Sequence, residues 1–203
     1  MHRLRQSRHG AGVLGAGEPD GGRDGAGAMA AAYEAARGPL AARLLAALRA
    51  AEGEGGDIRG RQSAALVVVG GERREKRWQG RVLELRVEDD PQPVEELARL
   101  YELQVAYDWM NRGDLYAERA QWDSAAVAYG TAERLAPQIA ELPFWHAVTL
   151  AAQGKVEESL PIFRRVFAAE DRWVELVPRL VPSGLLPDDP ALIARIQAAA
   201  PGR

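Results

Sequence analysis

The sequence has 203 residues, of which 47% are hydrophobic and 27% are charged, a composition typical of one or two globular domains. Its formal net charge of −3 gives no basic excess, so we expect no nucleic acid and no membrane among its partners. Cysteine is absent, which excludes disulfides and thiolate sites, and two of the three histidines lie in the glycine-rich N-terminus. We therefore expect no metal and no cofactor.

The sequence also shows no pattern typical of a membrane-spanning helix or a secretory signal. No apolar stretch approaches the roughly 20 residues that a membrane-spanning helix needs. The chain starts with basic residues, but no apolar segment follows them as it would in a secretory signal. We expect a cytoplasmic protein.

The first part of the chain changes character near Met29. Residues 1–28 are rich in glycine and charge and poor in bulky apolar groups, so we predict that they are disordered. Residues 29–52 are rich in Ala, Leu and Arg, which favour helix. Gly38 and Pro39 are expected to divide this stretch into two helices, with Pro39 opening the second.

A β-hairpin is predicted next. Residues 64–69 form a continuous apolar run, which predicts a strand that is covered on both faces. Residues 81–87 alternate polar and apolar side chains, as a half-buried strand does. The polar turn at 70–77 joins the two strands.

The loop before the first strand carries five candidate ligand-binding residues: Asp57, Arg59, Arg61, Gln62 and Ser63. In one interpretation the two arginines clamp a carboxylate, Asp57 orients one of them, and Ser63 donates to a carbonyl. In the other, the glycines supply unusual backbone angles and Asp57 forms a solvated ion pair with one arginine. The residues alone favour the second interpretation.

From Pro93 onward the sequence reads as all-helical, with a helix at 93–107 followed by an internal repeat. Three positions recur at the period of the tetratricopeptide motif: Ala125, Tyr129 and Ala132 return as Ser159, Phe163 and Val166. The first unit resembles that motif at seven positions, which we expect to form the repeat core together with Phe163: Trp109, Gly113, Tyr116, Ala125, Tyr129, Ala132 and Pro137.

Details of the helical part can be predicted as well. Small residues at Gly113 and Ala125 should let paired helices approach closely. Segments near 172–181 and 190–199 should cap the repeat, with Asp189 as the N-cap of the last helix. We expect His146 to be partly buried and hydrogen-bonded, and Trp145 and Trp173 to be more exposed than the repeat-core aromatics.

The run Gly-Asp-Ile-Arg-Gly-Arg-Gln-Ser-Ala-Ala-Leu at 56–66, with its flanks, resembles the domain of unknown function 1028 family, proteins with an N-terminal-nucleophile-hydrolase-like fold. The resemblance covers roughly residues 29–199. It implies an α+β chain: residues 29–90 would be the C-terminal part of an αββα module, and residues 91–203 a tetratricopeptide-like helical tail that carries a peptidoglycan-binding label in some members.

The resemblance also bears on activity and on the N-terminus. Such hydrolases use a Thr, Ser or Cys at the start of the mature first strand, and no residue here maps to that position, so we predict no catalytic residue and no hydrolase activity of the chain alone. Read one base later, permitted codons for residues 10–26 spell a peptide close to that of family members. We therefore interpret residues 1–28 as an out-of-frame segment, which the coding DNA would test.

Three functions remain open. The chain is a truncated hydrolase-like protein, a module whose helical repeat binds a peptide, a protein or a peptidoglycan fragment, or a scaffold that forms homo-oligomers. An unpaired apolar strand edge would favour the first, a polar and aromatic helical face the second, and a wide apolar patch on the helices the third. Because two strands alone are marginal, residues 29–90 should be less protected from hydrogen exchange than residues 91–199.

Overall fold

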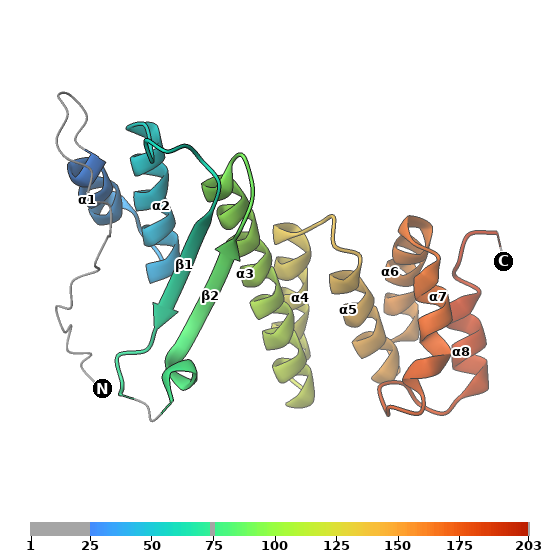
Figure 1. Cartoon of the computed structure of the whole chain (residues 1–203). Helices are drawn as coiled ribbons and strands as arrows, with labels where there is room; N and C mark the ends of the chain where they lie inside the picture. Colours follow the sequence, from blue (N-terminus) through green and yellow to red (C-terminus); the bar gives the residue numbers. More distant parts are fainter. Residues whose placement is uncertain (1–24, 74–75, 203) are drawn as a thin grey trace.

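The computed structural model describes residues 25–73 and 76–202, and in this part the fold is mostly helical with one two-stranded antiparallel sheet (Figure 1). The α+β class predicted from the sequence is confirmed at this level. The elements in chain order are α1 Gly25–Ala35, α2 Leu40–Gly53, β1 Ala64–Val69, the 3-10 helix η1 Arg77–Gly80, β2 Arg81–Val87, α3 Pro93–Glu118, α4 Trp122–Leu135, α5 Glu141–Ala152, α6 Val156–Ala169, α7 Arg172–Leu176, the 3-10 helix η2 Val177–Leu180 and α8 Pro190–Gln197.

The predicted helix break is present. Gly38 has a positive φ of 102°, and Pro39 precedes the first residue of α2. Helix α1 begins at Gly25, so it includes the last four residues of the segment 1–28 that we expected to be disordered. Residues 1–24 lie outside the described residues, and so do the predictions of disorder and of an out-of-frame segment for that stretch.

The hairpin has the predicted strand limits, but the prediction that β1 is covered on both faces is wrong. Leu66 pairs with Leu85 and is buried, whereas its neighbour Val67 pairs with Glu84 and is 43% exposed. Burial alternates along β1 because successive side chains point to opposite faces and only one face has a covering layer. A register irregularity between Val68 and Val69 interrupts the pairing near the turn.

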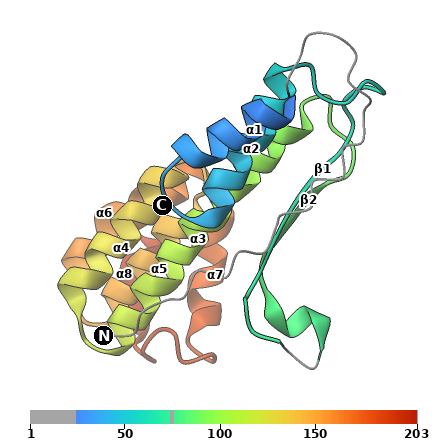
Figure 2. The ribbon, with the colours of Figure 1, turned by 90° about the vertical axis from the view of Figure 1, so that its left-hand side faces the viewer.

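Helices cover one face of the sheet. Leu45 of α2, Leu66 of β1 and Leu97 of α3 belong to one buried cluster, which also contains Ala41, Val87 and Ala98. Helices α1 to α8 lie on this side of the hairpin, η1 lies at its turn, and among the described residues the other face of the strands is open (Figure 2). The described part of this region therefore has two layers, the sheet and the helices on one of its faces.

A single long helix, α3, replaces the shorter helix expected at 93–107. It runs for 26 residues from Pro93 to Glu118 and contacts both the sheet and α4. No proline interrupts the sequence between its two halves, and Gly113 alone does not end a helix. Consequently α3 joins the hairpin module to the helical part.

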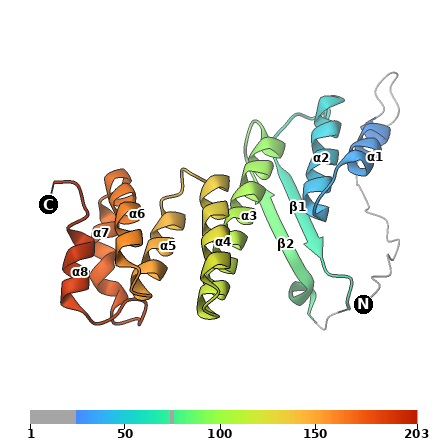
Figure 3. The ribbon, with the colours of Figure 1, turned by 180° about the vertical axis from the view of Figure 1, so that it is seen from behind.

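The helices after β2 form a row that extends away from the hairpin (Figure 3). Helix α3 packs along α4, and α5 packs along α6. The turns within these two pairs use the same backbone bond, one repeat period apart: Gln121 N–H donates to the Tyr116 carbonyl, and Lys155 N–H donates to that of Leu150. Helices α4 and α6 both have 14 residues, and their first residues are separated by the same period.

The C-terminal elements close the row. Phe144, Phe163 and Ile196 are fully buried in a cluster that α5 and α6 share with α7, η2 and α8. The Asp189 side chain accepts hydrogen bonds from the backbone N–H groups of Ala191 and Leu192, so it is the N-cap that the sequence predicted. Trp145 and Trp173 are partly buried against this cluster, so they are more exposed than Tyr129 and Phe163, as expected, but belong to the same burial class as Trp109 and Tyr116.

Candidate functional site

The loop that precedes β1 is open to solvent and is shaped by glycine. Gly55, Gly56 and Gly60 have positive φ values, which other residues adopt only with strain. Asp57 accepts two hydrogen bonds from the Arg59 guanidinium, at 2.9 and 2.5 Å, and one from its backbone N–H at 2.9 Å. These bonds hold the pKa of Asp57 far below its usual range. The predicted ion pair is therefore present and lies in solvent.

Arg61 does not join Arg59. Its Nε lies 2.6 Å from the Glu52 carboxylate at the end of α2. Nearby, Arg49 of α2 makes a bidentate pair with Glu95 of α3, at 2.9 and 2.7 Å. The two arginines of the loop thus bind different carboxylates, and the structure does not bring them together as a clamp.

A shallow depression of about 230 Å³ lies beside Arg61, lined by Glu52, Gly53, Arg61, Gln92, Val94 and Glu95. Gln62 and Ser63 are exposed, and the Gln62 carbonyl accepts a hydrogen bond from the Asp90 N–H at 2.9 Å. Of the five predicted residues, only Arg61 lines this depression. The Arg61 guanidinium already pairs with the Glu52 carboxylate. An anionic ligand would therefore gain little binding energy from Arg61.

The repeat-core residues predicted from the sequence lie mostly between α3 and α4. Ala125, Tyr129 and Ala132 are buried on α4, and Phe163 is buried on α6. Gly113 is buried on α3, and a Cβ atom at this position would lie 2.6 Å from Tyr129 Cε1. Trp109 and Tyr116 are partly buried, whereas Pro137 is exposed after α4.

A polar network crosses from one helix pair to the next around Tyr129. The Tyr129 hydroxyl donates to Asp114 Oδ1 on α3 at 2.7 Å, and it lies 3.1 Å from Thr149 Oγ1 on α5. Because that hydroxyl has one proton, the Thr149 hydroxyl is the donor in the second bond. Burial raises the pKa of Tyr129, and burial also raises the pKa of Asp114 although the Tyr129 bond opposes it.

His146 extends this network to α6. Its ring stacks on that of Tyr129, with centroids 4.7 Å apart, and its Nδ1 lies 3.2 Å from Glu133 Oε1. Arg165 donates to the other oxygen of Glu133 at 2.7 Å. Burial opposes ionisation of Glu133, but the bonds from His146 and Arg165 outweigh it and hold its pKa below the ordinary value. His146 is thus partly buried and hydrogen-bonded, as predicted.

A second polar contact between the helix pairs lies on α3 and α5. The Tyr107 hydroxyl donates to Glu141 Oε2 at 2.6 Å, and Trp145 Nε1 donates to Glu141 Oε1 at 3.2 Å. The Glu141 bond, together with burial, raises the pKa of Tyr107 to about 12. The result is a carboxylate held between two aromatic side chains, all three partly exposed.

Sequence reasoning missed this group, although a signal was present. Tyr107 and Glu141 are 34 residues apart, the same interval as the recurring core positions. Side chains at equivalent positions of stacked units lie next to one another, so the interval alone could have paired them. Asp114 and Thr149 follow no such interval, and only the fold brings them to Tyr129.

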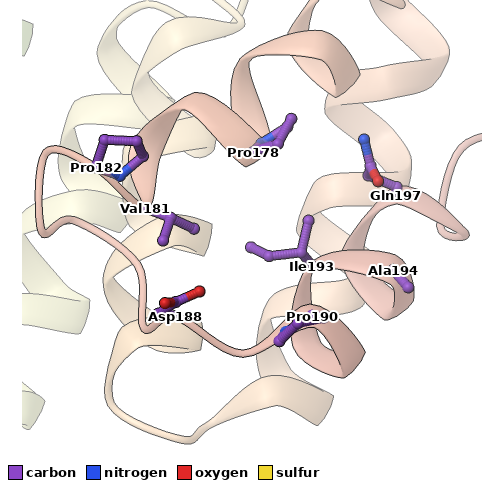
Figure 4. A pocket seen from close by; sticks show the side chains of 8 residues that line it. All are labelled: Pro178, Val181, Pro182, Asp188, Pro190, Ile193, Ala194 and Gln197. Carbon is purple, nitrogen blue, oxygen red and sulfur yellow. The ribbon is translucent and has the colours of Figure 1, made fainter.

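The C-terminal part has a further depression, of about 350 Å³, between η2 and α8 (Figure 4). Its walls are apolar, with Val181 and Ile193 facing each other across it and Asp188 and Gln197 as its polar residues. Pro178, Pro182, Pro190 and Ala194 complete the lining. It is wide and shallow, and no sequence motif marks it.

Among the described residues, no three His, Cys, Asp or Glu side chains gather as metal ligands would. None of the described helices combines the length and the apolar character that crossing a bilayer requires.

No curated protein and no solved structure matches the chain. A family model does match, over residues 4–97, which is slightly under half of the chain and includes most of the segment that we interpreted as out of frame. The helical part beyond residue 97 lies outside this match. The resemblance stated for the hairpin region is confirmed to this extent: residues 4–97 match the model described as Family of unknown function (DUF1028).

Proposed function

We propose that this chain is a binding protein without hydrolase activity of its own, and that its helical part binds a peptide through the face shared by α3 and α5. The observation that carries the proposal is the Tyr107–Glu141–Trp145 group, where one carboxylate lies between two partly exposed aromatic side chains. Aromatic rings supply contact area at low entropic cost, and a carboxylate supplies an oriented acceptor for a peptide N–H or a cationic group.

The distribution of exposed apolar side chains favours binding over helical self-association. Large exposed hydrophobic residues in the helical part are few and are spread along it: Leu115 on α3, Val127 and Leu135 on α4, and Leu185 between η2 and α8. The hairpin region has a denser set over a shorter stretch: Ile58, Val67, Val69, Trp78 and Val82. A scaffold that assembles through its helices would need the opposite distribution.

The charge of the ligand follows from the carboxylates at the contact between the helix pairs. Glu141 and Asp114 each accept a hydrogen bond from a tyrosine there, and burial raises the pKa of Asp114. A cationic side chain or a free amine would offset the cost of keeping these carboxylates ionised. We therefore propose a basic peptide as the ligand class. A peptidoglycan fragment is the second candidate, through the resemblance of this part to a tail that carries that label.

Two features support a tetratricopeptide-like interpretation of residues 93–169. The backbone bonds in the α3–α4 and α5–α6 turns recur at the repeat period, and Gly113 allows the Tyr129 ring to contact the α3 backbone. Stacked helix pairs of this kind present extended faces to peptides. Residues 29–90 are proposed to be the C-terminal part of a hydrolase-like module, because their sheet has one covered and one open face.

Peptide selection tests the binding proposal. The purified full chain would be used to select from a displayed random peptide library and, separately, to bind insoluble peptidoglycan. Peptides enriched on the wild-type chain should be rich in Lys and Arg and should lose affinity for the Glu141→Gln variant. Glu158→Gln, an exposed glutamate in the first turn of α6, is the matched control and should bind as the wild type does.

Three results would overturn the proposal: no enriched peptide, equal binding by E141Q and the wild type, or equal loss in E158Q. Retention on peptidoglycan with no peptide enriched would favour the second ligand class. The proposed lack of hydrolase activity is tested separately, by assaying the purified chain with a panel of chromogenic amides. Turnover that a single substitution within the chain abolishes would contradict it.

A further inference from the structure

Among the described residues, no strand pairs with the outer edge of β1. In the described residues the sheet has two strands, so β1 has β2 on one side and an open edge of backbone N–H and C=O groups on the other. Open edges of this kind pair with an extended strand that supplies the missing partners. The chemistry of the edge therefore requires a strand as its occupant.

Charge distinguishes the two strands. On the face away from the helices β2 carries Arg81, Glu84 and Arg86, where Glu84 forms ion pairs with both arginines, together with the exposed Val82. On the same face β1 carries Ala65, Val67 and Val69, of which Val67 is 43% and Val69 61% exposed. Charged side chains are the usual protection of an edge strand, and β1 has none among its six residues. The occupant of this edge is consequently an uncharged apolar strand.

The strand that meets these requirements is β1 itself. We propose that two copies of the chain pair antiparallel through β1 about a twofold axis, which gives a four-stranded sheet with the order β2–β1–β1–β2. Opposite residues of an antiparallel pair point to the same face, so only pairings between positions of equal parity, such as Leu66 with Leu66 or Ala65 with Val67, continue the sheet. Such pairings put the helices of both copies on one side.

The proposed dimer also separates the apolar side chains of the open face from the charged ones. It brings the two Ala65–Val67–Val69 rows side by side at the centre and leaves the two charged β2 rows at the rim. Apolar cross-strand pairs stabilise a sheet, and an apolar centre within a charged rim is the usual composition of an interface. A pairing through β2 would instead place the Arg81–Glu84–Arg86 rows of both copies opposite each other. This inference is independent of the proposed peptide binding.

The test is the mass of the full chain in solution, measured by sedimentation equilibrium over a wide range of concentrations. The wild type should reach twice the 22.0 kDa mass of one chain. Val67→Lys should remain monomeric, because each lysine would lie opposite Ala65 of the other copy and the two charged side chains would be diagonal neighbours across the axis. The same lysine should be tolerated within one chain, since Val67 is opposite Glu84. The matched control is Val82→Lys, at a more exposed position of β2 (71%), which should assemble as the wild type does.

Hydrogen exchange locates the contact. Backbone amides of β1 should exchange more slowly in the wild type than in V67K, while amides of β2 and α6 should not differ. If V67K loses its helical circular dichroism, Val69→Glu replaces it, because residue 69 is opposite Arg81.

A wild type that stays at the mass of one chain at every concentration overturns the proposal, and this is also the result expected if a different protein supplies the strand. Assembly that V67K retains, or that V82K loses equally, overturns it as well. So does slowed exchange that lies outside β1.

Discussion

Replacing Gly113 by alanine should destabilise the helical part, although the same replacement usually stabilises a helix. An alanine in place of glycine in an exposed helix is worth up to about 1 kcal/mol. Here the added Cβ would lie 2.6, 2.7 and 2.9 Å from three ring carbons of Tyr129, closer than carbon atoms approach in folded proteins.

Tyr129 has little freedom to move away. Its side chain is buried, its hydroxyl is bonded to Asp114 and Thr149, and its ring stacks on His146. Overpacking of this kind costs about 1–3 kcal/mol. Each hydrogen bond that the displaced ring would lose costs about 1 kcal/mol more. After the gain in helix propensity, we expect the free energy of unfolding to fall by about 2 kcal/mol.

Gly130→Ala is the matched control, because a Cβ at position 130 would meet only the end of the Arg134 side chain, at 3.5 Å. This variant should gain up to about 1 kcal/mol. Urea unfolding followed by circular dichroism at 222 nm measures both changes against the wild type. If G113A is as stable as the wild type, or gains stability as G130A does, the close contact between α3 and Tyr129 is not present as described.

Four further changes have defined outcomes. Asp114→Asn should raise the free energy of unfolding at neutral pH. Folding raises the pKa of Asp114, so keeping this carboxylate ionised costs stability above its ordinary pKa of 3.8, and asparagine avoids that cost. Urea unfolding at several pH values should show that the variant loses this advantage below pH 3.8. Glu141→Gln should lower the pKa of Tyr107 from about 12 toward 10.0 in ultraviolet titration, read as the difference from Tyr107→Phe, and an unchanged pKa would refute the Tyr107–Glu141 bond. Ala120→Gly should stabilise the chain by about 0.5–1 kcal/mol, since Ala120 has a φ of 54° where the equivalent turn has Gly154, and a loss of stability would contradict this backbone geometry. In the V67K variant, which should not assemble, backbone amides of α1 and β2 should exchange faster than those of α4 and α6. The reason is that α1 has no buried residue and the described sheet has only two strands. Equal protection of all four elements would contradict the proposal that residues 29–90 are part of a larger module.

Local sequence signals predicted the strands and the helix break with accurate limits. The strand limits at 64–69 and 81–87 are confirmed, because the apolar run, the polar turn and the alternating run leave little freedom in register. Gly38 and Pro39 separate α1 from α2 because one adopts a positive φ and the other cannot continue a helix.

Features that depend on a second layer or on distant partners could not be predicted in this way. The valines of β1 are equally compatible with one or two covering layers, and only the fold shows that one is present. The two halves of α3 were separated because the repeat suggested a new helix near Trp109, but the chain has no residue there that stops a helix. In the candidate loop, Arg61 binds Glu52 rather than a partner in its own loop, which a reading of short-range spacing does not reveal.

Peptide binding by the face of α3 and α5 is tested most directly by hydrogen exchange of the full chain with and without a selected peptide. We expect the peptide to slow exchange in α3 and α5, near Tyr107 and Glu141, and to leave the hairpin and α8 unchanged. Slowing confined to the hairpin or to the depression beside α8, or no slowing at saturating peptide, would contradict the proposed binding face.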